Sequence, residues 1–291
     1  MNEPHLRPLA STDAPAAVEM IAAANDATAR EHGQEPRPLP PERRRSFEER
    51  IAHFAVTDAP GCWAAEYDER LVGVSVAIRR GPLWALSLLF VHPDAQSRGL
   101  GGRLVALTRP YAEGAQIELV MASEDPRAIR RYAHLDLTLH PAVRAGGAVD
   151  RSRLPVDLPV RRGDHSDLGL VDAVDRKLRG GVSRAEDVGF LLDRGELMHI
   201  VDLPGRRGFV LAANGRVTCL GATDDETARE LLWAALAEVG DEVEIKGLTV
   251  TQGWAVDVAL AAGLSVTPSG PMFCRGWPQL PGPYLPSGVY F

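Results

Sequence analysis

The sequence predicts a mixed α/β fold that occurs twice in tandem, each copy being a mostly antiparallel mixed sheet flanked by helices. Three observations predict it. The chain has 291 residues, about twice the usual size of one domain. Its first half passes from three closely spaced apolar runs to an alternation of strand-like and helix-like segments, which is typical of a mixed sheet covered by helices. The second half repeats much of this order.

Composition narrows the class of protein. Apolar residues make up 45% and charged residues 24%, as in ordinary globular proteins, and the net charge of −7 gives no basic excess for binding nucleic acid. The chain has no run of eighteen apolar residues and no secretory signal, so we expect no membrane span and a cytoplasmic location. Cys62, Cys219 and Cys274 lie far apart without a C-x-x-C motif, which favours reduced thiols and predicts no metal site.

Apolar spacing and turn residues place the elements of the first half in order. A helix capped by Ser11 or Asp13 should carry Ala17, Val18, Ile21 and Ala24 on one face, and the prolines of Glu35–Pro41 should end it. Short connections between the apolar runs predict an antiparallel meander. The expected strands and helices are His5–Leu9, Phe47–Val56 (helix), Cys62–Tyr67, Leu71–Ile78, Leu83–Val91, Gly101–Ala112 (helix), Gln116–Ala122, Pro126–Leu135 (helix) and Leu137–Val143.

The second half repeats this order at an offset of 127 residues. Pro126–Leu137 then falls on Gly253–Leu264, and the helix Gly102–Ala112 falls on Arg229–Val239. With a one-residue slip, the strand Ile117–Val120 matches Val243–Lys246. The stretch Gly146–Pro159 looks like a linker, and we predict a duplication with a first domain at 1–147, a linker at 148–159 and a second domain at 160–291. The proline-rich tail Gly276–Phe291 should be extended and lie across another surface.

The segment from Leu88 to Val105 carries the clearest chemical signal. A buried strand ends at Val91, Pro93 stops it, and Gln96–Gly102 turns the chain into a helix whose first amides have no partner inside the helix. These amides and the positive end of the helix dipole favour an anion. Gly99 and Gly101 remove side chains that would keep a diphosphate from the backbone.

Two other phosphate-binding motifs do not fit this loop. A Walker loop needs Gly-Lys-Ser/Thr, and a dinucleotide fingerprint needs glycine where Leu104 stands. The motif Gln-x-x-Gly-x-Gly behind V-x-P instead resembles the acyl-CoA loop of the GCN5-related N-acetyltransferase (GNAT) superfamily. The resemblance implies that the loop amides hold the diphosphate of coenzyme A and that the preceding strand pairs with the pantetheine arm. The residues it assigns to the cofactor are Phe90, Val91, Gln96, Ser97, Arg98, Gly99, Leu100, Gly101 and Gly102.

A second segment, from Asp125 to Leu137, resembles the helix Asn-x-x-Ala-x-x-x-Tyr-x-x-x-Gly-Phe of the same superfamily. The resemblance gives Tyr132 the place of the tyrosine that protonates the departing thiolate, and a phenol stays protonated at neutral pH. Asp125 replaces the usual asparagine as a cofactor contact, and Asp136 and Leu137 replace Gly and Phe. An aromatic residue that only packs on a helix face is the alternative for Tyr132.

The second copy lacks the loop residues and the tyrosine at the same offset. Gln96, Gly99 and Gly101 become Thr223, Glu226 and Ala228, and Tyr132 becomes Ala259. Carboxylates in Thr-Asp-Asp-Glu would repel a diphosphate. We expect only the first copy to bind acyl-CoA, and the second to be structural and to shape the substrate cleft.

The residue that accepts a proton from the attacking amine is left open. The strand Leu83–Val91 contains no carboxylate, so the candidates are Glu118 on the neighbouring strand and Glu66 in the meander. The carboxylate of Phe291 is a third, because in some members of the superfamily the chain terminus reaches the active site. His53 sits beside Phe54 and is more typical of helix packing.

The sequence thus predicts an acyl-CoA-dependent N-acyltransferase that transfers acetyl from acetyl-CoA to a primary amine of a small molecule by direct attack. An acyl-CoA-sensing or partner-binding module without turnover is the alternative, and a third interpretation places unfamiliar catalysis in the second domain. The sequence identifies neither the acceptor nor the oligomeric state, so a homodimer stays open. Nucleic-acid and membrane partners are not expected.

Overall fold

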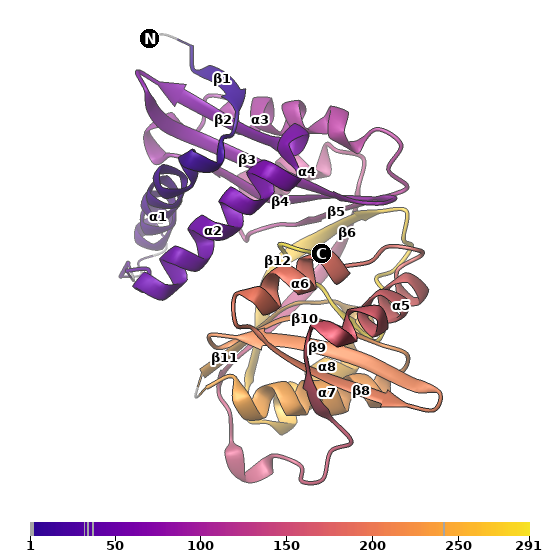
Figure 1. Ribbon diagram of the computed structural model, residues 1–291. Helices are drawn as coiled ribbons and strands as arrows, with labels where there is room; N and C mark the ends of the chain where they lie inside the picture. The colour runs from indigo at the N-terminus through magenta and orange to yellow at the C-terminus, as the bar shows by residue number, and fades with distance from the viewer. Residues whose placement is uncertain (1–2, 32, 34, 37, 241) are drawn as a thin grey trace. The chain divides into compact units, whose positions relative to one another are not determined.

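The computed structural model describes residues 3–31, 33, 35–36, 38–240 and 242–291. Two compact units divide them. The first unit comprises residues 1–79 and 84–115, and the second comprises residues 80–83 and 116–291. These limits differ from the domain boundaries expected from the sequence, which stay a prediction. The chain is a mixed α/β protein in which helices flank mixed sheets, as predicted (Figure 1).

The first unit is built on the meander. Its sheet has the order β1-β2-β3-β4, with β1 antiparallel to β2 and β2 antiparallel to β3. Asp68 and Glu69 both have positive φ, which is the geometry that closes a two-residue hairpin between β2 and β3. The elements of this unit are β1 (His5–Pro8), α1 (Ala14–Glu31), α2 (Pro41–Thr57), β2 (Cys62–Tyr67), β3 (Arg70–Arg80), β4 (Leu83–Val91) and α3 (Leu100–Thr108).

Helix boundaries differ from the expected ones where proline acts. Helix α2 begins at Pro41, before the expected Phe47, because proline is well suited to the first helical position. Helix α3 ends at Thr108 because Pro110 interrupts it, and the chain continues as a 3₁₀ turn to Ala112. Apolar packing fixes α3 to the sheet: Leu104 lies so close to Gly73 that a Cβ there would be 2.8 Å from the leucine.

The second unit holds the remaining elements. They are β5 (Ile117–Met121), α4 (Pro126–Ala133), β6 (Thr138–Ala148), β7 (Arg161–Gly163), α5 (Leu168–Leu178), α6 (Ala185–Asp193), β8 (Leu197–Leu203), β9 (Arg206–Ala213), β10 (Arg216–Ala222), α7 (Asp225–Glu238), β11 (Glu242–Leu248), α8 (Gly253–Ala261), β12 (Ser265–Arg275) and β13 (Tyr284–Leu285). In Figure 1, α5 and α6 lie on one side of strands β8 to β10, and α7 and α8 lie on the other. An apolar cluster of this unit includes Leu231 and Leu232 of α7 and Trp254 of α8.

Strand β6 extends into the start of the stretch Gly146–Pro159. Strand β6 continues to Ala148 because Gly146 pairs with Ser265 of β12 and with Glu244 of β11. Residues 149–160 connect β6 to β7, with a short 3₁₀ turn at Arg151–Arg153.

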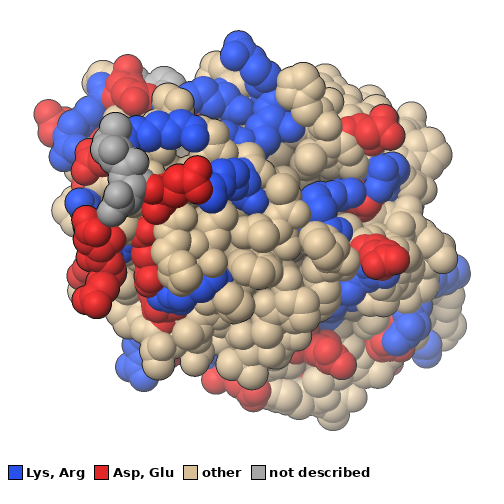
Figure 2. All heavy atoms as spheres, turned by 90° about the horizontal axis from the view of Figure 1, so that it is seen from above, with Lys and Arg blue, Asp and Glu red and all other residues tan. Residues whose placement is uncertain are grey.

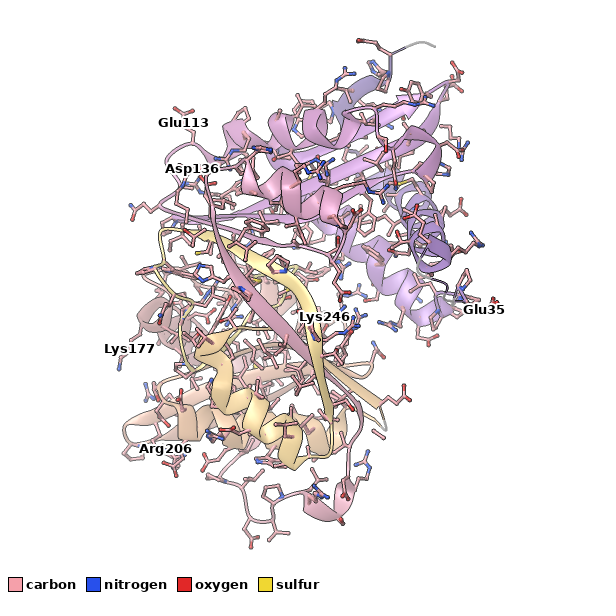
Figure 3. All side chains as sticks on the ribbon, turned by 180° about the vertical axis from the view of Figure 1, so that it is seen from behind. Glu35, Glu113, Asp136, Lys177, Arg206 and Lys246 are labelled. Carbon is pink, nitrogen blue, oxygen red and sulfur yellow. The ribbon has the colours of Figure 1, made fainter. Side chains whose placement is uncertain are left out.

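Strands β6 and β12 show the duplication directly. They are antiparallel neighbours, seen side by side from behind in Figure 3. Ala142 pairs with Ser269, so two positions that are 127 residues apart in the sequence face each other across the pair. The strand order β5-β12-β6-β11 means that each copy's last strand lies beside a strand of the other copy. The two copies therefore exchange their final strands.

Candidate functional site

The loop between β4 and α3 is closed at its base by Gln96. Its side-chain Nε2 donates a hydrogen bond to the Val91 main-chain oxygen at 3.0 Å, and Pro93–Ala95 forms a 3₁₀ turn between them. Gln96 therefore holds the loop to the end of the strand. Ser97, Arg98 and Gly99 are exposed, and Ser97 has a φ of 62°.

Glycine sets the geometry at the start of α3. Gly99 is the N-cap residue with a φ of 75°, a left-handed conformation that glycine adopts without strain. Within the described residues no side chain caps this helix, and a Cβ on Gly99 or Gly102 would meet nothing within 4 Å. The start of α3 is therefore not covered by a side chain, and the positive end of the helix there suits an anion; the Gly102 N–H already donates to the Gly99 oxygen at 3.0 Å.

The other predicted cofactor residues differ in how far they are buried. The Leu100 side chain is buried with Ala95 and Leu104, so only its amide could serve a ligand. Phe90 and Val91 are half-buried and end β4, whose first residues are fully buried. The strand that leads into the loop is therefore most accessible at its loop end.

Two side chains of the first unit that the sequence suggested as proton acceptors have local partners. Glu66 on β2 forms an ion pair with Arg7 of β1, and Arg7 also binds Asp13 at 2.6 Å. These hydrogen bonds hold the pKa of Asp13 below its usual value although burial opposes the shift. His53 packs with Phe54, their ring centroids being 5.5 Å apart, as a helix-packing histidine would.

Helix α4 in the second unit begins at Asp125. Its carboxylate accepts a hydrogen bond from the Arg127 backbone N–H at 2.8 Å and pairs with the Arg127 guanidinium at 3.0 Å. Burial raises the pKa of Asp125, but these hydrogen bonds outweigh it and keep the pKa below its usual value. Asp125 thus acts as the helix cap, a role that the sequence analysis did not assign to it.

Tyr132 and Glu118 approach the same strand of the second copy. Tyr132 is 6% exposed, and its ring meets Phe273 edge-on at 5.9 Å. Glu118 is 1% exposed, pairs with Arg275 across β5 and β12, and forms an ion pair with it. Phe273 and Arg275 are two positions apart on β12, so they lie on one face of that strand. Burial raises the pKa of Tyr132 to about 12, which keeps the phenol protonated at neutral pH.

Sequence reasoning missed Phe273 and Arg275. The internal offset places β12 in register with β6, but no local pattern shows that β12 lies beside β5. The structure thus places Tyr132 and Glu118 against residues of one strand, β12, in the second unit, with Asp125 capping the helix that carries Tyr132. The predicted cofactor loop, Phe90, Val91 and Glu66 lie in the first unit.

The second copy has no counterpart of the glycine loop. Only Thr223 and Asp224 separate β10 from α7, whereas residues 92–99 separate β4 from α3. Glu226 and Ala228, expected to replace the loop glycines, lie inside α7. The Asp224 carboxylate caps this helix by accepting from the Thr227 backbone N–H at 2.8 Å. The Asp224 carboxylate therefore occupies the position that a bound anion would take at the start of α7.

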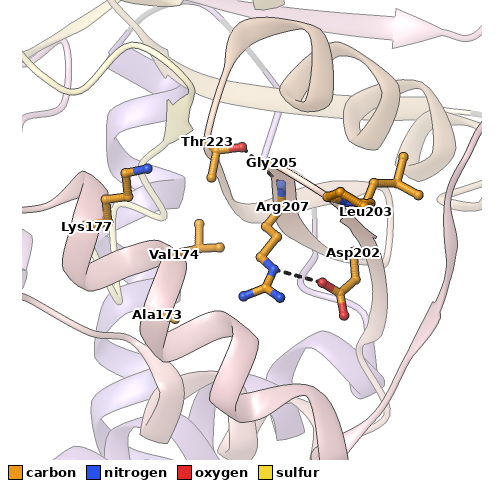
Figure 4. Close-up of a pocket in the computed structure, with 9 residues that line it drawn as sticks. Ala173, Val174, Lys177, Asp202, Leu203, Gly205, Arg207 and Thr223 are labelled. Atoms are coloured by element: carbon orange, nitrogen blue, oxygen red, sulfur yellow. Dashed lines mark hydrogen bonds and ion pairs between the residues drawn. The ribbon is translucent and has the colours of Figure 1, made fainter.

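A pocket of about 560 Å³ opens elsewhere in the second unit, between α5 and the turn that joins β8 to β9. Lys177 and Arg207 lie on opposite sides of it, and Arg207 pairs with Asp202 at 2.9 Å (Figure 4). The described residues that line it include none of the predicted site residues. Figure 2 shows that basic and acidic side chains both occur on the face it draws.

The described residues contain neither a membrane-spanning helix nor a cluster of metal-ligating side chains. No helix among them is long and apolar enough to cross a membrane. No three His, Cys, Asp or Glu side chains among them gather as a metal site would require.

Comparison with known proteins agrees with this geometry. Residues 25–136 match the model of the Acetyltransferase (GNAT) family, a stretch that contains the loop and Tyr132. That stretch thus matches the GNAT family, and the chain as a whole has the fold of a tandem GNAT protein. A candidate acetyltransferase from Pyrococcus horikoshii has a similar structure, with a TM-score of 0.79 and 16% identity over 99% of this chain and 96% of that one.

Two further solved structures resemble this chain over nearly its whole length. A GCN5-related N-acetyltransferase from Sphaerobacter thermophilus gives a TM-score of 0.60 at 16% identity, covering 94% of this chain and 96% of that chain. A tandem GNAT protein from the clavulanic acid biosynthesis pathway gives 0.54 at 17%, covering 95% and 100%. At such identities the likeness concerns the fold alone. No curated protein matches the sequence.

Proposed function

We propose that this GNAT protein transfers the acetyl group of acetyl-CoA to a primary amine of a small molecule. The observation that carries the proposal is the uncapped start of α3 behind Gly99, at the accessible end of β4. The amides of Gly99–Gly101 bind the diphosphate of acetyl-CoA, and the hydrogen bond from Gln96 to Val91 holds the loop in place. The main chain of Phe90 and Val91 pairs with the pantetheine arm.

The reaction in this proposal is direct attack of the amine on the thioester carbon. The C–N bond forms, the C–S bond breaks, and the electron pair of that bond leaves with the sulfur. A backbone amide near Val91 polarises the carbonyl, and Tyr132 donates its proton to the thiolate. The raised pKa of Tyr132, about 12, supports this role because the donor is present throughout the neutral range.

Glu118 is the proposed acceptor of the amine proton, ahead of Glu66 and the carboxylate of Phe291. Its support is that Glu118 and Tyr132 meet neighbouring residues on one face of β12. Glu118 must loosen its ion pair with Arg275 to accept the proton. Phe291 is fully buried, and its main-chain oxygen accepts a hydrogen bond from Arg179.

Thermal unfolding with acetyl-CoA tests the binding part of the proposal. A ligand that binds only the folded state stabilises it by about 2.7 kcal/mol at a hundred times its Kd. We expect acetyl-CoA to raise the Tm of the wild type and Gly99→Glu to abolish the rise. Gly195→Glu is the matched control, because Gly195 also has positive φ and open space around its Cα. A wild type that responds to no acyl-CoA would refute the proposal.

A sensor that binds acyl-CoA without turnover is the second candidate. It is favoured by the arginine partners of both candidate acceptors, Glu118 and Glu66. An assay of thiol release over a panel of small amines separates the two functions. Release with any amine supports the enzyme, and binding without release from any of them supports the sensor.

A further inference from the structure

The chain returns to β10 after β12. Strand β13 pairs antiparallel with β10, Leu285 opposite Leu220 and Tyr284 opposite Gly221. The Ala222 N–H also donates to the Pro283 oxygen at 2.9 Å. Strand β13 thus supplies main-chain partners to the end of β10 that leads into α7.

This segment lies where β10 and β11 separate. The two strands are parallel neighbours at Arg216 and Glu244, near the start of β10. Farther along, Pro286 packs so tightly on Gly247 of β11 that a Cβ there would be 2.8 Å from the proline. Residues 283–286 therefore fill the gap between the two strands.

Buried charges hold the segment in place. Arg184 donates to the main-chain oxygens of Leu285 and Leu220, each at 3.3 Å, and pairs with Asp175 at 2.8 Å. Arg179 also pairs with Asp175 and donates to the Phe291 main-chain oxygen. The side chains of Asp175, Arg179 and Arg184 are wholly buried. Buried charges are costly unless paired, so these arginines need acceptors, and the tail supplies two of them, the main-chain oxygens of Leu285 and Phe291.

The Tyr284 ring completes the cluster. It lies 4.9 Å from the Arg184 guanidinium and 5.5 Å from that of Arg179, within the range of a cation–π contact. The Tyr284 side chain is itself fully buried. One element thus combines strand pairing, hydrogen bonds from buried arginines and ring contacts, as a bound peptide does.

The corresponding strand of the first copy is different. Residues 87–91 at the end of β4 are half-buried, whereas residues 219–222 at the end of β10 are fully buried. Beyond the strands, α3 begins uncapped at Gly99, and α7 is capped by Asp224. In the first copy, the accessible strand end and the uncapped helix start suit a thioester carrier. In the second copy, strand β13 pairs with the strand end and the Asp224 carboxylate caps the helix.

We propose that the edge of β10 is a strand-addition site whose resident occupant is the segment 283–291 of the same chain. This occupancy closes the second copy to acyl-CoA, so the protein holds one acyl-CoA per chain. The statement about stoichiometry rests on the proposed function, whereas the statement about the occupant does not.

Hydrogen exchange followed by mass spectrometry on the full chain tests the occupant. The peptides that contain residues 219–222 and 283–291 should exchange slowly and together. In Leu285→Gly both should exchange about ten-fold faster or more, because the pairing is weakened on both sides. Gln279→Gly, an exposed position of the tail outside β13, should change neither. Protection at residues 219–222 that persists while 283–291 is released would overturn the proposal.

Leu285→Gly could also unfold the whole second unit, and peptides from α8 report this. In that event wild-type exchange decides: slow exchange in both segments supports the resident occupant, and fast exchange at 283–291 overturns it.

Native mass spectrometry with acetyl-CoA tests the stoichiometry. The wild type should bind one molecule per chain and Gly99→Glu none, with exchange slowed at residues 91–102 and unchanged at 219–222. Two molecules per wild-type chain, or one retained in Gly99→Glu, would overturn the exclusion. No binding by the wild type would instead refute the proposed function and leave the exchange result on the occupant standing.

Discussion

Gly99 and Asp224 stand at the same place in two similar helices and have opposite effects. Each is the N-cap residue of the helix that follows the strand β4 or β10. Gly99 has no side chain and leaves the first amides open to a ligand, whereas Asp224 offers a carboxylate to the Thr227 amide. A single side chain thus decides whether a helix start can receive a foreign anion.

Tyr132→Phe separates catalysis from packing. Phenylalanine keeps the ring contact with Phe273 but removes the proton donor, so kcat should fall by about 100-fold or more while the Tm rise with acetyl-CoA persists. In the wild type the Tyr132 pKa of about 12 predicts no loss of the donor up to about pH 10. Steady-state rates against pH check both points. Tyr67→Phe serves as the control, and an unchanged kcat in Tyr132→Phe would exclude the acid role.

Tyr284→Phe should be tolerated. The Tyr284 hydroxyl is buried and has no hydrogen-bond partner among the described residues, so its removal loses no bond and ends a desolvation cost. The ring over Arg184 stays. We expect the Tm of Tyr284→Phe to equal or exceed that of the wild type, whereas Tyr284→Ala should lose about 3–5 kcal/mol of unfolding free energy. Denaturant unfolding measures both, and a large loss in the phenylalanine variant would show a partner for the hydroxyl.

At the scale of elements, the cap of α7 makes a prediction about stability and pH. Asp224→Ala removes the acceptor for the Thr227 amide and should cost about 1 kcal/mol. Asp225→Ala, one residue further and exposed, removes the same charge without removing the cap and should cost less.

The pH dependence of that difference follows from the Asp224 pKa. Burial raises it, but the hydrogen bonds from Thr227 and Thr223 outweigh burial and keep it below 3.8. A lowered folded-state pKa stabilises the fold above the unfolded pKa. The stability difference between wild type and Asp224→Ala should therefore be complete at neutral pH and shrink as the pH falls below 3.8. Urea unfolding at several pH values measures it, and a difference that grows in acid would contradict the cap.

At the scale of the whole molecule, the exchange of β6 and β12 binds the two copies together. Strand β12 pairs with β5 and β6, and β6 also pairs with β11. The fragment 155–291 lacks β6, so β11 and β12 each lose a neighbour. This makes catalysis by an isolated second domain hard to test on that fragment.

A cut in the connection between β6 and β7 tests the exchange. A protease site placed after the exposed Val156 should give two pieces that elute together and unfold with nearly the Tm of the intact chain. The fragment 155–291 made alone should lack a cooperative transition. Pieces that separate on size exclusion under native conditions would contradict the shared strands.

The sequence by itself determined the local features. The glycines after β4, the internal offset of 127 residues and the order of apolar runs predicted the mixed fold, the duplication and the resemblance to the GNAT superfamily, because each is a pattern of residue types that can be read along the chain. Helix ends near proline were predicted less accurately, as α2 and α3 show.

Only the tertiary structure decided what the distant segments do. That β12 supplies Phe273 to Tyr132 and Arg275 to Glu118, and that residues 283–291 occupy the edge of β10, depends on pairing between strands far apart in sequence. Any strand edge offers the same row of amides and carbonyls, so local sequence does not specify its partner. The partner is chosen by which apolar faces and charges can be buried together, and that is settled by the fold as a whole.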